Sequence, residues 1–222
     1  MKEAFDIFWK KSLKAKEAGD WVLLHHVLRD DEEINNGVYI PGTKSKDGWA
    51  DWLPKLQSEP VDFEKIDSWF SLARRAPIHQ QMKEYVSTYW FMNLEGFLDE
   101  IAEASEANDD DDDDERYTLY LDAVEPRKSV LSIFESYIHQ YNNRKSFQAY
   151  DGFTYLLQFG TFLEIGDAQG GIYGGLYFNN DTGEVICVDW DWVYSDFKKP
   201  LEEVSYKVAS SLEELIKKLE PR

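Results

Sequence analysis

Hydrophobic and polar positions alternate with a period of two in the last third of the chain. Residues 170–192 read as two strands joined by a tight turn at residues 179–183, where Asn, Asp and Gly accept the backbone angles that tight turns need. In the second strand, apolar residues alternate with others as far as Trp192, which predicts one apolar face. On this pattern the acidic and aromatic side chains lie on opposite faces: Asp189 and Asp191 on one, Trp190 and Trp192 on the other.

Apolar residues at helical spacing predict helices elsewhere. The predicted ranges are 2–18, 62–75 and 129–140, the last with Ser129 as N-cap. Another helix is expected to begin at Pro77, and a terminal helix follows the capping-box sequence Ser211–Glu214.

Continuous apolar runs predict further strands at residues 89–94, 117–121 and 153–162. The first strand of the hairpin carries four glycines, which predict a β-bulge or a close approach of two backbones; these are Gly170, Gly171, Gly174 and Gly175.

Strands and helices do not alternate strictly, and the last strands are linked by a hairpin. This order predicts an α+β fold with a single central, largely antiparallel sheet and helices packed on it. A chain of 222 residues, 43% of them hydrophobic, is long enough to bury a real core. We therefore expect residues 1–222 to form a single domain.

One segment of the chain is strongly acidic. Between Asp99 and Glu115 there are eleven acidic residues and no basic one, so residues 102–116 are interpreted as a flexible acidic insertion. The insertion is either merely solvated or a charged arm that attracts a basic partner. Calcium binding is a third option, but the spaced ligands and the Gly of an EF-hand loop are missing. The residues proposed for partner binding here are Asp109, Asp110, Asp111 and Asp112.

The formal net charge of −19 narrows the classes of partner. Binding to nucleic acid by phosphate neutralisation is not expected, and a basic protein is the physical complement, although acidity also serves plain solubility. No stretch approaches 18 apolar residues and the N-terminus lacks a signal-peptide core, so we expect no membrane insertion and a cytoplasmic location.

The residue types of known catalytic and metal sites are not arranged in a recognisable pattern. No GxSxG sequence occurs, and the adjacent His25 and His26 point in different directions on a helix or a strand. Cys187, the one cysteine, is read as a buried structural thiol. Asp189 and Asp191 resemble a DxD metal pair, a spacing that arises often by chance. We expect no catalysis, no cofactor and no metal.

Aromatic residues form 15% of the chain, enough to fill a core and leave rings for a recognition surface. Trp and Tyr are typical anchors of protein interfaces, and carboxylates steer a basic partner toward them. The hairpin residues predicted to bind a partner are Asp189, Trp190, Asp191, Trp192, Tyr173 and Tyr177. The alternative is that both Trp side chains are core and both Asp side chains are only solvated.

Several short segments, in order, resemble the SUKH superfamily, and within it the Syd-type branch of SecY-interacting proteins. They are Trp52-x-Pro54, Pro77-Ile-His79, Asn180-Asp-Thr-Gly-Glu-Val185 and the ending Val208–Pro221, in which a strand leads into a Ser-capped helix. The resemblance covers roughly residues 50–95 and 130–221 and depends on the order and spacing of these segments.

The resemblance implies an α+β fold and a binding function without catalysis. Many bacterial members are immunity proteins that neutralise toxin domains, often nucleases, and Syd binds the cytosolic face of the SecY channel. We therefore expect an immunity-type protein that neutralises a basic, nuclease-like toxin domain; the alternative is a Syd-like protein that binds SecY.

Overall fold

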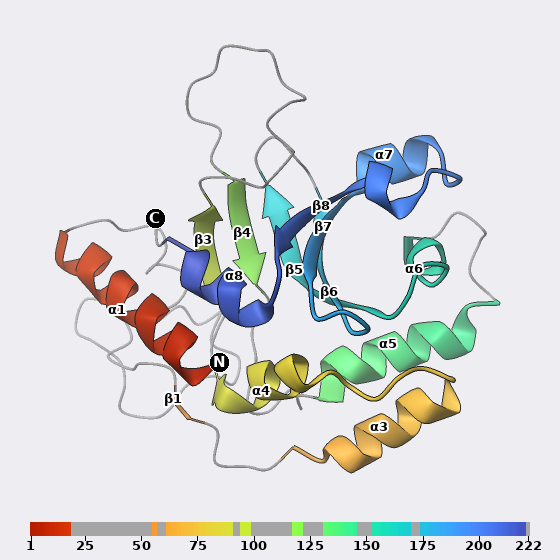
Figure 1. The fold of residues 1–222 in the computed structure, drawn as a ribbon, viewed down its shortest axis with the longest axis horizontal. Coiled ribbons are helices and arrows are strands. Elements are labelled where there is room, and N and C mark those ends of the chain that lie inside the picture. The colour runs from red at the N-terminus through yellow and green to blue at the C-terminus, as the bar shows by residue number, and fades with distance from the viewer. Residues whose placement is uncertain are drawn as a thin grey trace, which may run out of the picture.

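A six-stranded antiparallel sheet crosses the protein, and its strands are neighbours in chain order (Figure 1). The computed structural model describes residues 1–18, 55–56, 61–90, 94–98, 117–121, 131–145, 152–169 and 174–220. The strands are β3 (Leu94–Leu98), β4 (Tyr117–Leu121), β5 (Phe162–Gln169), β6 (Gly174–Asn179), β7 (Val185–Asp189) and β8 (Ser205–Ala209). The predicted α+β fold with one main antiparallel sheet is confirmed.

Helices pack on this sheet, and most of them lie in ranges that the sequence predicted to be helical. They are α1 (Lys2–Ala18), α3 (Phe63–Leu72), α4 (Gln80–Thr88), α5 (Leu131–Asn143), α6 (Gly152–Leu156), α7 (Trp190–Ser195), the 3-10 helix η2 (Leu201–Glu203) and α8 (Leu212–Lys218). The expected N-cap of α5, Ser129, lies outside the described residues. Ser211 caps α8 as predicted, because its hydroxyl accepts a hydrogen bond of 3.0 Å from the backbone N–H of Glu214.

The strand predicted over residues 89–94 is two elements. β2 (Tyr89–Trp90) continues directly from α4 and pairs antiparallel with β1 (Lys55–Leu56), whereas β3 begins only at Leu94 and pairs with β4. A continuous apolar run does not reveal which neighbour each residue pairs with, so sequence alone did not separate the two.

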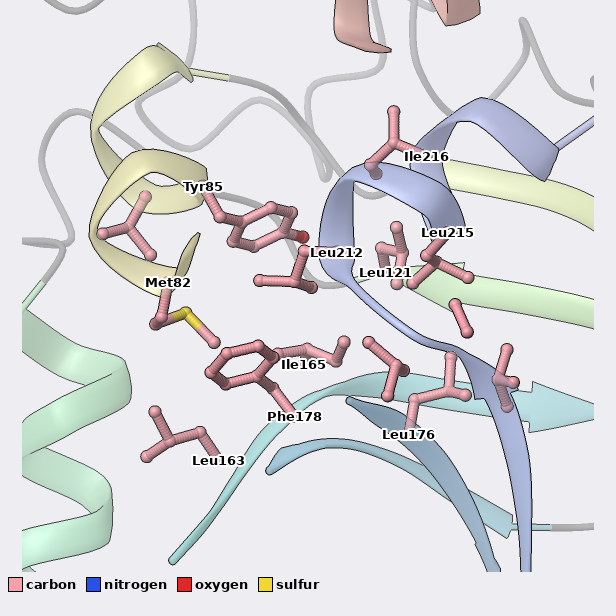
Figure 2. Close-up of a cluster of buried hydrophobic side chains, with 14 of the residues drawn as sticks. Met82, Tyr85, Leu121, Leu163, Ile165, Leu176, Phe178, Leu212, Leu215 and Ile216 are labelled. Carbon is pink, nitrogen blue, oxygen red and sulfur yellow. The ribbon is translucent and has the colours of Figure 1, made fainter. Parts of the chain in front are cut away.

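The larger hydrophobic core lies between one face of the sheet and helices α1, α3, α4, α5 and α8. Figure 2 shows Met82 and Tyr85 of α4 opposite Leu212 of α8, with Leu176 and Phe178 of β6 below them. All five side chains are almost fully buried. The amphipathic stripes that identified these helices in the sequence are therefore the surfaces that cover the sheet.

A second, smaller core covers the opposite face of strands β5 to β7. It contains Tyr155, Leu156, Phe162, Tyr177, Val188, Val193 and Val204. The side chains come from α6, from α7 and from the segment before β8, in addition to the strands. This part of the sheet is therefore apolar on both faces, which explains why its strands do not show a simple in-and-out pattern of burial.

The strand predicted over residues 153–162 is wrong. Residues 152–156 form α6, a turn follows, and the strand begins at Phe162. The helix is favoured by tertiary packing: Gly152 lies so close to the Trp190 ring that an added Cβ would be 2.9 Å from it, and Tyr155 of the same helix is buried in the second core. An apolar run of this length is compatible with either element, and here the long-range packing decides.

The glycines of β6 allow the close approach that the sequence predicted. A Cβ on Gly174 would lie 2.3 Å from the carbonyl oxygen of Val188 on β7. The register irregularities, however, lie elsewhere: in β5 between Glu164 and Gly166, and in the pairing of β7 with β8 between Val185 and Ile186. Gly170 and Gly171 lie outside the described residues.

Segments about 100 residues apart meet at the start of α4. The Asn180 side chain accepts a hydrogen bond from the His79 backbone N–H (2.8 Å) and donates one to the Pro77 carbonyl (3.0 Å). Gln81 Oε1 accepts a hydrogen bond of 3.0 Å from the backbone N–H of Leu212, at the start of α8. Three of the segments that carry the family resemblance are thus neighbours in space.

Candidate functional site

Strand β7 ends at Asp189, and the next residues turn into helix α7. Asp189 Oδ1 accepts hydrogen bonds from the backbone N–H groups of Asp191 (3.0 Å) and Trp192 (3.2 Å). This is N-cap geometry: the carboxylate satisfies donors that the first helical turn leaves without a partner. The prediction that the strand continues to Trp192 is therefore wrong.

The helix changes where each of the four predicted binding residues lies. Asp189 is 8% exposed and serves the cap, whereas Asp191 is exposed. Trp190 is half-buried against Gly152, and Trp192 is 55% exposed. The four side chains do not form an acidic face and an aromatic face, and the two carboxylates have different roles, so a paired DxD metal site is not supported.

A chain of aromatic contacts runs from the sheet to the surface of α7. The Trp190 ring meets Tyr177 of β6 edge-on at 5.8 Å between centroids and stacks on Tyr194 at 5.9 Å. Tyr194 in turn contacts Phe197 at 5.6 Å. These contacts fix α7 and the Tyr194 ring against the second core.

Tyr177 belongs to the inner end of this chain and not to a binding surface. It is buried, and burial raises the pKa of its hydroxyl far above the usual value, with the negative charge of Glu164 adding to the effect. The prediction that Tyr177 contacts a partner is therefore corrected: it supports Trp190 from behind. Sequence could not distinguish this role because Tyr177 lies in the middle of a Gly-rich strand.

Four exposed residues of α7 and its C-cap, together with the half-buried Lys199 of the following turn, form the candidate site here called the α7 surface: Asp191, Trp192, Tyr194, Asp196 and Lys199. Tyr194 is 56% exposed and Trp192 55%, both large values for aromatic side chains. Lys199 lies over the Trp192 ring with its Nζ 3.9 Å from the ring centroid, and the adjacent Lys198 is exposed. The surface thus combines aromatic area with charge, as protein-binding sites do.

More carboxylates lie next to this surface. Burial raises the pKa of Tyr155, and the negative charges of Glu202 and Glu203 raise it further, so both acidic groups lie near this ring. Both are exposed on η2, and the Tyr155 hydroxyl also donates a hydrogen bond of 3.0 Å to the carbonyl of Lys199. The acidic side chains of η2 and the α7 surface are therefore parts of one region.

Cys187 has a structural role, as the sequence indicated, and His79 contributes to the start of α4. Burial raises the pKa of the Cys187 thiol to about 12, with the charges of Asp189 and Asp167 adding to the shift, so the reactive thiolate is suppressed. His79 Nδ1 accepts a hydrogen bond of 3.2 Å from the backbone N–H of Gln81 at the start of α4.

The described ranges contain neither a cluster of metal-ligating side chains nor a helix that could span a membrane. No group of three or more His, Cys, Asp or Glu side chains in them is placed to hold a metal ion. None of the helices within these ranges combines the length and apolarity needed to cross a membrane.

A second exposed apolar feature lies between α3 and α5. A hollow of about 400 Å³ is lined by Trp69, Leu72, Ala73 and Ile138, with Glu135 and His139 also contributing. Leu72 is 84% exposed. Nothing in this region indicates a particular ligand, so Leu72 serves below as a control for the exposed residues of α7.

The remaining predicted binding residues, Tyr173 and Asp109 to Asp112, lie outside the described residues, as do His25 and His26. Sequence reasoning missed Tyr194 and Lys199. The N-cap preference of Asp189 could have placed Tyr194 on a helix, whereas Lys199 is brought to Trp192 by the turn after α7 and by the Tyr155 hydrogen bond, which the sequence does not reveal.

No protein-family model matches the chain, and the search of curated proteins gave no significant match.

Proposed function

We propose that this protein binds a basic protein partner through the α7 surface, as an immunity-type protein that neutralises a cationic, nuclease-like toxin domain in the cytoplasm. The observation that carries the proposal is the pair of exposed rings, Trp192 and Tyr194, on a helix fixed by a buried cap. Interfaces concentrate their binding energy in a few such aromatic anchors. The toxin as the partner rests on the SUKH-like segments of the sequence.

Charge supports a basic partner over other classes. The chain carries 43 acidic and 24 basic residues. Acidic side chains around an aromatic anchor speed the encounter with a cationic surface and disfavour acidic partners. A toxin that cuts nucleic acid has a cationic active surface, and a protein that covers this surface blocks the toxin without any chemistry of its own.

Co-expression with the toxin encoded by the neighbouring gene tests the proposal. We expect the wild-type chain to protect cells and to co-purify with the toxin. The Trp192→Ser variant should lose both properties, and Leu72→Ser, which removes an apolar side chain that is even more exposed, should keep them. Failure of the wild-type chain to protect or co-purify would contradict the proposal, and equal effects of both variants would exclude the α7 surface.

In the Syd-like alternative, the acidic chain binds SecY in place of a toxin domain. Its support is the Syd-type character of the sequence segments. A pull-down with SecY-containing membranes at low and high salt separates the two functions, because a Syd-like protein should be retained at low salt and released at high salt. Retention on these membranes without protection against the toxin would favour SecY.

A further inference from the structure

The exposed ring of Trp192 already holds a cation in the free protein. The Lys199 ammonium lies 3.9 Å from the ring centroid, well within the range of a cation–π interaction. Lys199 is half-buried in the turn that follows the proposed binding helix, and in a chain with so strong an acidic excess the placement of its ammonium on an exposed ring needs an explanation.

Both members of this pair are positioned by groups in the interior. The Trp192 backbone N–H donates to the buried Asp189 carboxylate, which fixes the start of the helix. On the other side, the carbonyl of Lys199 accepts a hydrogen bond from the hydroxyl of Tyr155, a side chain that is only 1% exposed. The Lys199 N–H also donates to the carbonyl of Asp196 at 3.2 Å. These hydrogen bonds fix the backbone of both residues, and from that position the Lys199 side chain reaches the ring.

The surroundings favour a guanidinium group over this ammonium. Asp191 and Asp196 are exposed carboxylates on the same helix and its C-cap. A guanidinium is planar, stacks on aromatic rings, is more weakly hydrated than an ammonium and donates two parallel hydrogen bonds to one carboxylate. A guanidinium that stacks on the Trp192 ring and also bonds to one of these carboxylates adds an ion pair to the cation–π contact that Lys199 makes.

We propose that Trp192 is the receptor for an arginine side chain of the basic partner, and that Lys199 occupies this position until the partner displaces it. This inference rests on the proposed function and adds the chemistry of the contact and a competitor within the chain. Lys199 then lowers the affinity for arginine and limits binding to partners that offer a guanidinium in the right place.

The test compares two lysines that are adjacent in the chain. Lys199→Ala and Lys198→Ala remove the same charge, but only Lys199 lies on the ring. The probe is a hexa-arginine peptide, titrated into the full chain by calorimetry at low salt, with hexalysine as the comparison. We expect Lys199→Ala to bind hexa-arginine about three-fold more tightly than Lys198→Ala does, because it loses the competing cation–π contact.

Two further readouts complete the test. Trp192→Leu should weaken hexa-arginine binding about five-fold, and the indole N–H resonance of Trp192, assigned with Trp192→Phe, should shift during the titration. Hexalysine should bind the wild-type chain more weakly than hexa-arginine. Far-ultraviolet circular dichroism checks that the variants keep the fold.

Several outcomes would overturn the inference. Equal gains for the two lysine variants would mean that only net charge matters, and equal affinity for both peptides would remove the preference for guanidinium. An unshifted Trp192 resonance, or no binding of hexa-arginine, would also refute it. None of these results decides the proposed function, which the toxin protection assay with Trp192→Ser and Leu72→Ser measures separately.

Discussion

The Asp189 carboxylate accepts a hydrogen bond of 3.2 Å from the backbone N–H of Trp192, so a buried acidic group at the end of a strand sets the start of the helix that carries an exposed indole. The same oxygen accepts from Asp191 N–H at 3.0 Å. The strand β7, its capping residue and the helix α7 are therefore directly linked, and a change at the cap alters the position of the exposed side chains of α7.

The first prediction concerns this cap. Asp189→Ala should lower the free energy of unfolding by about 1–2 kcal/mol, because two backbone donors of α7 lose their acceptor. Asp191→Ala, at an exposed position in the first turn, should change it by less than about 0.5 kcal/mol. Urea denaturation measures both. Equal effects of the two variants would show that the Asp189 hydrogen bonds contribute nothing specific.

Gly166 and Gly183 provide a second, matched pair. Gly166 has φ 150°, and an added Cβ would lie 1.8 Å from the Tyr120 carbonyl oxygen of the neighbouring strand. Gly166→Ala should therefore cost about 3 kcal/mol or more, or prevent folding. At Gly183 (φ 83°) the nearest atoms are the side-chain ends of Gln81 and His79, 3.0 Å away. There Ala should cost only about 1 kcal/mol.

Thermal denaturation and expression yield of the two glycine variants measure this difference. If Gly166→Ala is as stable as Gly183→Ala, the close approach of β5 and β4 at this point is not present in solution.

The third prediction concerns the link between the hairpin turn and α4. Asn180 is buried, and its side chain satisfies backbone groups of both Pro77 and His79. Asn180→Ala should lower the free energy of unfolding by about 2–3 kcal/mol, because both groups lose their partner inside the protein. Asn179→Ala should cost less, about 1 kcal/mol, since Asn179 caps only its own exposed turn. Urea denaturation of both variants is the measurement, and a reversed order would contradict the role of Asn180.

The fourth prediction is a pH dependence from Cys187. The thiol pKa is raised from 9.0 to about 12 by burial, so the folded state keeps a proton that the unfolded state releases. Below pH 9 both states hold this proton and stability is unaffected. Between pH 9 and about 12 the unfolded state binds fewer protons, so stability falls by about 1.4 kcal/mol per pH unit.

Comparison with Cys187→Ala isolates this contribution, because every other titrating group is retained. From pH 8 to pH 10 the wild-type chain should lose about 1.4 kcal/mol more than the variant does, as measured by urea denaturation. Equal losses would mean that the thiol is accessible or that its pKa is not raised. Slow reaction of the native thiol with a disulfide reagent at pH 8 is a second check.

Elements with a local cause were predictable from the sequence. The Ser211 hydroxyl caps the terminal helix through a donor three residues away, and the turn before β7 needs only Gly183 with a positive φ. The helices α1 and α3 and the strand β4 also lie where their apolar patterns placed them. Such signals are complete within a short stretch, so the chain need not be folded for them to be read.

The errors share a different cause. Residues 152–162 and 189–192 are apolar or alternating runs that fit a strand as well as a short helix. Each becomes helical because it packs on the other: Trp190 of α7 lies against Gly152 of α6, and both helices cover the second core. The apolar pattern of neither stretch reveals this packing, and the one local signal is the N-cap residue Asp189.

For the candidate binding residues, too, some properties follow from the sequence and others only from the fold. Composition and charge established an acidic, aromatic-rich chain, and the pattern of apolar positions and turn residues indicated an α+β fold with a hairpin near its end. Only the tertiary structure decided that Tyr177 is buried, that Trp192 is exposed and that Lys199 lies on its ring. The physical reason is that the burial or exposure of a side chain depends on contacts with residues distant in sequence. These contacts form only when the sheet is covered on both faces.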